Sequence, residues 1–377
     1  LKLWAHSRVR TEGAVVGMVA PAPNAGMPVA GGVRLITYGE AMIRFAPPAG
    51  GREDDWRNRP SATSTRVRSV GGDELNVCVA LARLGRDASW ASVLPTGPLG
   101  AVVRGCAEDA KVRLDHLVVS EEEGGEVGTF YVLPEEGRVH YQRRHSAFCT
   151  QRAGLFNWER ILTERAAGGV PAWLHMTGIT PMLGTEAAES WKSAIQAAGH
   201  AGLPVSLDLN YRPQLGPFEQ LWAMVVPVLA HVDILILSAH SCVELTEQLR
   251  ASAAVSAEPA AKRARFGAGT VATPGGDTTG AVLPSLQEVH ARLGGPAVVC
   301  CLKERGSDGR QRRWSIIVDA EGVHSTEGMP TLHTPQDECG GGSAWAAGMI
   351  DGLSQALVSA GHHKPRRVDQ VVALGSD

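Results

Sequence analysis

The sequence lacks a strong charge imbalance, long apolar runs and paired cysteines, and each absence excludes a class of protein. Its 36 Lys and Arg residues nearly balance 39 Asp and Glu residues, which leaves a formal net charge of −3. A chain without a basic field is not expected to bind nucleic acid. No run of about 18 apolar residues occurs, so no membrane span is expected. The 377 residues, 44% of them hydrophobic, suffice for one large α/β core or two smaller ones.

Seven cysteines are scattered along the chain, without a Cys-x-x-Cys pair or a histidine spacing suited to zinc. An odd, unpaired set of this kind is typical of a reducing compartment. Residues 1–33 carry few acids but several bases, among them Lys2, Arg8 and Arg10. They fit two alternatives, the remnant of a plastid or mitochondrial transit peptide or a plain extension. We therefore expect a cytoplasmic protein, or an organellar one if the first alternative holds.

Strands and helices alternate from residue 172 onward, with apolar strand-like runs separated by segments of helical periodicity. That order predicts a parallel sheet with helices on both faces, whose ligands bind at the carboxyl ends of the strands. Asp208, Asn210 and Arg212 follow one such strand, so they are candidate binding residues.

Two other segments have a recognisable pattern. Residues 129–133 and 139–147 flank a Pro-Glu-Glu-Gly turn, which predicts a β-hairpin. Residues 250–294 are rich in Ala, Gly, Pro and Thr and contain a short basic cluster. This composition predicts an inserted, largely mobile loop, with partner binding as the alternative.

Three consecutive glycines, Gly340, Gly341 and Gly342, precede Ser343 and an apolar run of helical character. Bare backbone N–H groups in such a turn can face an anion, and the following helix adds the positive end of its dipole. The motif therefore predicts a phosphate-binding turn. The alternative is a flexible turn that leads into a packed helix.

The run from Asp337 to Gly348 resembles the C-terminal signature of the ribokinase-like (PfkB) sugar kinases, in the form found in 2-keto-3-deoxygluconate kinases. Further motifs carry the same resemblance in chain order, over about residues 34–352. They are Gly39-Glu40-Ala-Met-Ile-Arg, Gly71-Gly72-x-Glu74-x-Asn76 and Asp208-Leu-Asn210-Tyr-Arg212-Pro.

The resemblance implies a three-layer α/β/α sandwich with a mostly parallel central sheet and a small β-sheet lid. The lid strands are expected within about residues 38–50 and 127–147, inside one kinase domain of residues 34–377 with a short C-terminus. The resemblance also implies ATP and Mg²⁺ as cofactors and a sugar acid as the phosphoryl acceptor. For assembly, it suggests a homodimer or a subunit of a larger complex.

Site residues are implied by the same resemblance, position by position. The sugar is expected to contact two glycines, two lid side chains and polar motif residues, namely Gly71, Gly72, Asn76, Tyr131, Arg143, Asp208, Asn210 and Arg212. Arg143 is expected to grip the sugar-acid carboxylate, since a guanidinium pairs with a carboxylate bidentately. The nucleotide side is expected around the last strands of the sheet, namely at Ser238, Lys303, Gly306 and Gly309. No metal-ligating side chain is assigned.

The sequence departs from the family pattern at two acidic positions. Ser343 stands where the family has the aspartate that takes the proton from the sugar hydroxyl. Ser241 stands where the family has a glutamate near the phosphates and magnesium. A carboxylate base typically contributes ~10²–10⁴ in rate, and a neutral serine hydroxyl does not accept that proton at pH 7.

Two main hypotheses follow from these departures. One is an ATP-dependent sugar-acid kinase of the 2-keto-3-deoxygluconate type, weak or rescued by another acid such as Asp337 or Glu338. The other is a catalytically inactive pseudokinase that acts as a scaffold or as a subunit of a larger assembly. A sugar-binding sensor is a third, purely binding class. Turnover of 2-keto-3-deoxygluconate, measured alongside Ser343→Asp, separates a kinase from the other two.

Overall fold

The structure is a computed structural model, in which most of the chain after residue 33 is described. The described residues are 34–47, 66–121, 125–133, 138–163, 172–257, 278–306, 308, 310–327, 331–333 and 340–359. The extension of residues 1–33, together with Gly309, Asp337 and Glu338, lies outside the described residues. What the sequence predicts for these positions stays a prediction.

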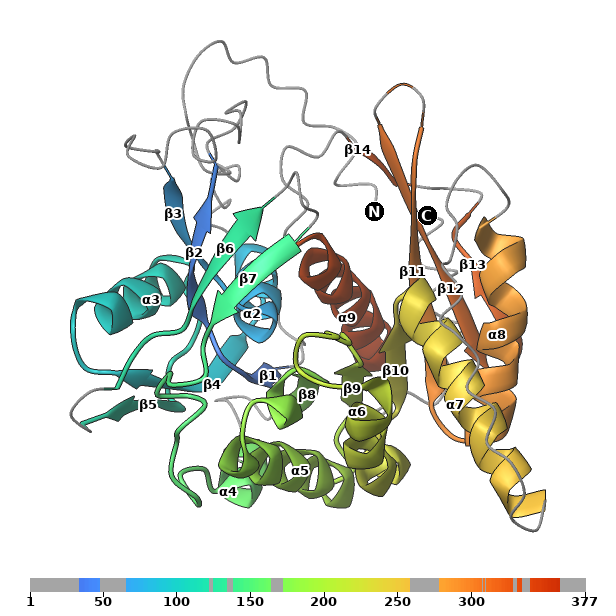
Figure 1. The fold of residues 1–377 in the computed structure, drawn as a ribbon, viewed down its shortest axis with the longest axis horizontal. Coiled ribbons are helices and arrows are strands. Elements are labelled where there is room, and N and C mark those ends of the chain that lie inside the picture. The colour runs from blue at the N-terminus through green and yellow to red at the C-terminus, as the bar shows by residue number, and fades with distance from the viewer. Residues whose placement is uncertain are drawn as a thin grey trace.

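A large, mostly parallel sheet forms the centre of the molecule (Figure 1). Its strands, in spatial order, are β13 (Gly322–Ser325), β12 (Gln311–Asp319), β11 (Ala297–Arg305), β10 (Ile234–Leu237), β9 (Val205–Asp208), β8 (Ala172–Thr177), β1 (Arg34–Tyr38), β4 (Ala88–Pro95) and β5 (Leu117–Ser120). From β11 to β5 all neighbours are parallel, whereas β12 pairs antiparallel with β11, with β13 and with β14 (Thr331–His333). Strands β1, β4, β8 and β10 are buried along their whole length, as expected for parallel strands covered on both faces.

Helices cover both faces of this sheet. One face packs against α4 (Trp158–Thr163), α5 (Thr185–His200), α6 (Phe218–Val225), α7 (Ala239–Ala257) and α8 (Thr278–Leu293), with short 3₁₀ turns at Thr180–Met182 and Val226–His231. The other face packs against α2 (Asp73–Arg83), α3 (Pro98–Asp109) and α9 (Gly341–Ser359). Successive residues of a strand enter opposite cores, as Leu35 and Ile36 of β1 do. The predicted three-layer α/β/α sandwich is confirmed.

A second, four-stranded sheet lies beside the N-terminal half of the central sheet (Figure 1). Its order is β3 (Val67–Gly71), β2 (Met42–Ala46), β6 (Thr129–Leu133) and β7 (Arg138–Gln142). Strands β6 and β7 form the predicted hairpin, with Thr129 opposite Gln142, but the second strand ends at Gln142 and not at residue 147 as predicted. Strand β3 runs directly into α2, so the small sheet is connected to the helix that opens the candidate site.

The predicted loop of residues 250–294 is wrong at both ends, because α7 extends to Ala257 and α8 begins at Thr278. Val282, Leu286 and Val289 repeat at helical spacing along α8 and are buried in the core. That apolar stripe, hidden in a composition rich in Ala, Gly and Thr, stabilises a helix there. Residues 258–277 lie outside the described residues.

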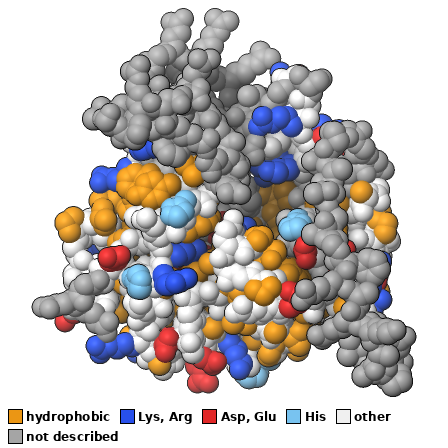
Figure 2. Space-filling view, viewed as in Figure 1, with side chains coloured by type: hydrophobic (Ala, Val, Ile, Leu, Met, Phe, Trp, Pro, Cys, Tyr) orange, Lys and Arg blue, Asp and Glu red, His pale blue; other side chains and the backbone are white. Residues whose placement is uncertain are grey.

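Among the described helices, none is long and apolar enough to cross a membrane. On the face drawn in Figure 2, the described Lys and Arg side chains alternate with Asp, Glu and apolar side chains.

Gly72 is expected to tolerate no side chain, because a Cβ there would meet the carbonyl oxygen of Glu40 and lie 2.9 Å from the Cα of Ala41. Gly72→Ala therefore forces backbone movement and should lower the free energy of unfolding by about 1–3 kcal/mol in urea denaturation. Gly105→Ala is the matched control, since nothing lies within 4 Å of its Cβ position in α3. The control should gain about 0.5–1 kcal/mol. Equal stabilities for both variants would contradict the packing argument.

Candidate active site

The glycine turn forms the first turn of α9. Gly340 has a φ of 81°, a left-handed conformation that favours glycine, and α9 begins at Gly341. The N–H of Ala344 donates to the carbonyl of Gly340 at 2.9 Å and closes the first helical turn. The N–H groups of Gly341, Gly342 and Ser343 therefore remain outside the helical hydrogen-bond pattern. Together with the helix dipole, they make this end of α9 suited to an anion.

Ser343 faces α2 rather than solvent. Its side chain is 5% exposed, and its hydroxyl donates to Asp73 Oδ1 at 2.9 Å. Asp73 is the first residue of α2, and its Oδ2 lies 3.7 Å from Arg212 Nη2. The first turns of α9 and α2 and the segment after β9 therefore meet at one carboxylate.

Asp208 ends β9 on the same side of the sheet. The N–H of Asn210 donates to Asp208 Oδ1 at 2.9 Å, and Asn210 holds a φ of 42° to make that turn. The pKa of Asp208 is raised to about 7, first by burial and then by the negative charge of Asp73, while Asn210 and Arg212 lower it. Near neutral pH this carboxyl can therefore donate a hydrogen bond in its protonated form or accept one in its ionised form.

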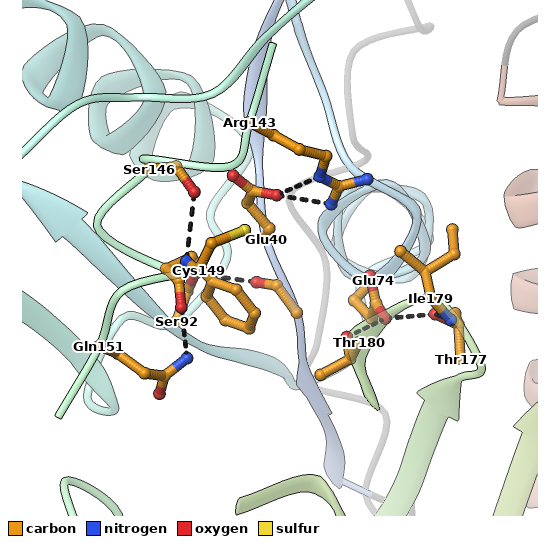
Figure 3. A network of polar contacts seen from close by, with 12 residues as sticks. Glu40, Glu74, Ser92, Arg143, Ser146, Cys149, Gln151, Thr177, Ile179 and Thr180 are labelled. Carbon is orange, nitrogen blue, oxygen red and sulfur yellow. Dashed lines mark hydrogen bonds and ion pairs between the residues drawn. The ribbon is translucent and has the colours of Figure 1, made fainter. Parts of the chain in front are cut away.

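Glu74 fixes the start of α2 against the central sheet (Figure 3). It is 2% exposed and accepts hydrogen bonds from Thr177 Oγ1 at 2.6 Å and Thr180 Oγ1 at 3.0 Å. Burial raises the pKa of Glu74 to about 7, with Asp73 adding to the rise. Its carboxyl also fills the space where a side chain at Gly39 would stand. Asp73 directly precedes Glu74 in α2, so this buried contact also fixes the position of Asp73.

Gly71 and Gly72 are required for close packing. A Cβ on Gly71 would lie 2.9 Å from the Phe130 ring of β6, and one on Gly72 would meet the backbone of Glu40. Asn76 is closer to the predicted ligand, because its Nδ2 is 3.6 Å from where a Cβ of Gly340 would stand. The N-terminal motif therefore packs directly against the glycine turn.

The two predicted lid side chains, Arg143 and Tyr131, contact other residues of the protein. The Nε of Arg143 donates to Glu40 Oε2 at 2.6 Å and its Nη2 pairs with the same oxygen, as Figure 3 shows. Tyr131 stacks on Phe45 with ring centroids 5.0 Å apart. The charge of Arg143 is thus compensated by a buried carboxylate, which the sequence analysis did not anticipate.

The expected nucleotide residues are only partly brought together. Ser238 Oγ accepts the N–H of Ser241 at 3.0 Å and lies 2.8 Å from Ser241 Oγ, so it caps α7. Lys303 is exposed on β11, and Gly306 belongs to the turn that joins β11 to β12. The three described residues of this set therefore lie at two places, Ser238 at the start of α7 and Lys303 and Gly306 at one end of the β11–β12 hairpin.

Two charged residues of the site were missed by sequence analysis. Asp73 occupies the unspecified position of the Gly-Gly-x-Glu motif, and an acid directly after a glycine at a helix start was the available signal. Arg313 packs on the glycine turn, with its Nη2 2.6 Å from where a Cβ of Gly341 would stand. No sequence pattern marked Arg313, since it lies inside a strand of mixed charge.

The fold defines a ribokinase-like α/β protein. A 2-dehydro-3-deoxygluconokinase from Thermotoga maritima superimposes with a TM-score of 0.67 at 24% identity, covering 92% of this chain and 100% of that one. A fructokinase double mutant from Vibrio cholerae, solved with fructose, ADP and potassium, superimposes with a TM-score of 0.64 at 18% identity, covering 91% and 89%. The predicted fold family is confirmed.

The chain belongs to the pfkB family of carbohydrate kinases, whose model matches residues 34–283. It is 32% identical over 206 residues to a 2-dehydro-3-deoxygalactonokinase of Haloferax volcanii, covering 54% of this chain and 59% of that protein. It is 29% identical over 185 residues to a 2-dehydro-3-deoxygluconokinase of Bacillus subtilis, covering 48% and 52%. The chain therefore spans little more than half the length of these two relatives.

Glu74→Gln tests the buried carboxyl. Because the pKa of Glu74 rises from 4.5 to about 7 on folding, its contribution to stability is complete below pH 4.5 and is lost as the pH rises through 7. Relative to the variant, the wild type should lose about 3 kcal/mol of unfolding free energy over this interval. Urea denaturation at closely spaced pH values measures the difference, with the surface variant Glu108→Gln as control. A constant difference across the interval would contradict the assignment.

Proposed function

We propose that this protein transfers the terminal phosphoryl group of ATP to a hydroxyl of a 2-keto-3-deoxy sugar acid. The observation that carries the proposal is the meeting of Ser343, Asp73 and Arg212 beside the glycine turn. Membership of a carbohydrate kinase family and the names of the two relatives support the same class of substrate.

The glycine turn is suited to the nucleotide phosphates. Phosphoryl transfer needs little covalent chemistry from the protein, and it depends on positioning and on electrostatic stabilisation of the phosphate oxygens. The N–H groups of Gly341, Gly342 and Ser343 and the guanidinium of Arg313 offer positive groups around one point. Ser238, Lys303 and Gly306 remain our proposal for the outer part of the nucleotide site.

The acceptor sugar is assigned to the carboxyl end of β9. Asp208 and Asn210 present hydroxyl-binding groups there, and Asn76 approaches from α2. Arg212 is 35% exposed, donates from Nη1 to the carbonyl of Tyr211 at 3.3 Å and lies 3.7 Å from Asp73 through Nη2, which leaves further guanidinium N–H donors for a ligand carboxylate. Arg143 is available to a carboxylate only in competition with Glu40. We therefore place the acid group of the sugar near Arg212, with Arg143 and Tyr131 as residues of the lid.

Magnesium fits this site as an ion carried by the nucleotide. Mg²⁺ is usually held by substrate phosphates, water and one or two carboxylates. In the described part of the chain, no group of three or more His, Cys, Asp or Glu side chains could hold a metal. We assign no side chain of this chain to the ion, which the nucleotide phosphates and water would hold. When bound, the ion neutralises charge on the phosphates.

Turnover with sugar acids tests the proposal directly. Purified protein with ATP and Mg²⁺ should release ADP when given 2-dehydro-3-deoxygluconate or 2-dehydro-3-deoxygalactonate, the acids after which the relatives are named. Fructose should be used at least roughly tenfold less efficiently, because it lacks the carboxylate that pairs with arginine. Release of ADP is followed in a coupled assay, with calorimetry for binding. Binding of both ligands without turnover would contradict the proposal and favour an inactive scaffold.

A further inference from the structure

We propose that Asp73, on α2, is the general base that replaces the missing carboxylate of residue 343. This inference rests on the proposed kinase function. The carboxylate oxygen Asp73 Oδ1 accepts a hydrogen bond from Ser343 Oγ at 2.9 Å, so it lies next to the end of the Ser343 side chain. The negative charge absent from the first turn of α9 is therefore supplied at nearly the same place by the facing helix.

The two oxygens of Asp73 have different surroundings. Oδ1 accepts the Ser343 hydroxyl, which fixes the orientation of the carboxylate. Oδ2 lies 3.7 Å from Arg212 Nη2, longer than a hydrogen bond, so its lone pairs are open to an incoming hydroxyl. The Asp73 side chain is 30% exposed, whereas Ser343 is 5% exposed. A sugar hydroxyl therefore reaches Asp73 Oδ2 more easily than it reaches Ser343.

The proton balance is complete with these groups. As the sugar oxygen bonds to the terminal phosphorus of ATP, its O–H bond breaks and the proton moves to Asp73 Oδ2. The phosphorus–oxygen bond to ADP breaks, and the departing oxygen keeps the electron pair. Asp73 then returns the proton to water through its exposed edge. Ser343 holds the base in position and exchanges no proton with the sugar.

Asp208 is the competing candidate, and its contacts place it second. Its Oδ1 is occupied by the N–H of Asn210, and burial keeps it partly protonated at neutral pH. Its role as a hydrogen-bonding group for the sugar uses both protonation states. Asp73 differs because its Oδ1 accepts the Ser343 hydroxyl directly, whereas Arg212 acts on both carboxylates.

The first test is Asp73→Asn, which keeps the shape of the side chain and its acceptor for Ser343 but removes the base. We expect kcat to fall by ~10²–10⁴ while the KM of the sugar acid changes by less than about threefold. Asp115→Asn is the matched control, because Asp115 is half exposed and pairs with Arg113 elsewhere on the surface. A variant with normal kcat, or with loss confined to sugar binding, would overturn the assignment.

The second test asks whether a base restored at residue 343 rescues the first variant. In the Asp73→Asn background, Ser343→Asp should raise kcat at least roughly tenfold by returning a carboxylate to the site. In the wild-type background the same change should lower kcat, because two carboxylates about 3 Å apart cannot both ionise. A merely structural role of Asp73 predicts no rescue. Ser343→Asp is thus expected to raise kcat when residue 73 is Asn and to lower kcat when it is Asp. This difference measures the coupling between the two positions.

The outcomes separate this inference from the proposed function. If the wild type and Asp73→Asn both turn over but Asp208→Asn does not, the role of Asp73 is overturned. The proposed kinase activity is then retained. No turnover by the wild type with any sugar acid overturns both. Loss in Asp73→Asn with rescue by Ser343→Asp supports both.

Discussion

The buried carboxyl of Glu74 is the contact on which the site depends. It accepts hydrogen bonds from Thr177 at the end of β8 and from Thr180 in the 3₁₀ turn that follows, which hold the first turn of α2 against the sheet. Asp73 precedes Glu74 and is thereby presented to the glycine turn of α9. A buried carboxyl is retained only where hydrogen bonds offset its desolvation, and here those bonds also position a charged neighbour.

The position of Asp73 determines the electrostatic character of the candidate site. The first turns of α2 and α9 meet at the Asp73 carboxylate, which faces Arg212, and Arg313 lies against Gly341 in the glycine turn. These positive groups suit phosphates and a sugar acid, while burial, with the charge of Asp73 adding to it, raises the pKa of Asp208. In our proposal, the fold of the pfkB carbohydrate kinases is combined with a rearranged set of acids, in which the catalytic carboxylate comes from α2.

The fold could be predicted from sequence because its signals are local. Alternating strands and helices, and glycine motifs at helix starts, each depend on a few neighbouring residues. The contact between Ser343 and Asp73 joins residues 270 positions apart, and that between Arg143 and Glu40 joins residues 103 apart. No single-sequence pattern reports such pairs. The ends of the 250–294 segment were missed for another reason, since composition masked the helical stripe of α8.

A crystal structure with a sugar acid and a non-hydrolysable ATP analogue tests the central claim, that the glycine turn and the Asp73–Ser343 pair form one site. The account predicts the terminal phosphate at the N–H groups of Gly341 and Gly342. It also predicts the acceptor hydroxyl within about 3 Å of Asp73. A sugar whose hydroxyl lies beyond about 5 Å from both Asp73 and Ser343, with the phosphate still at the turn, would contradict it.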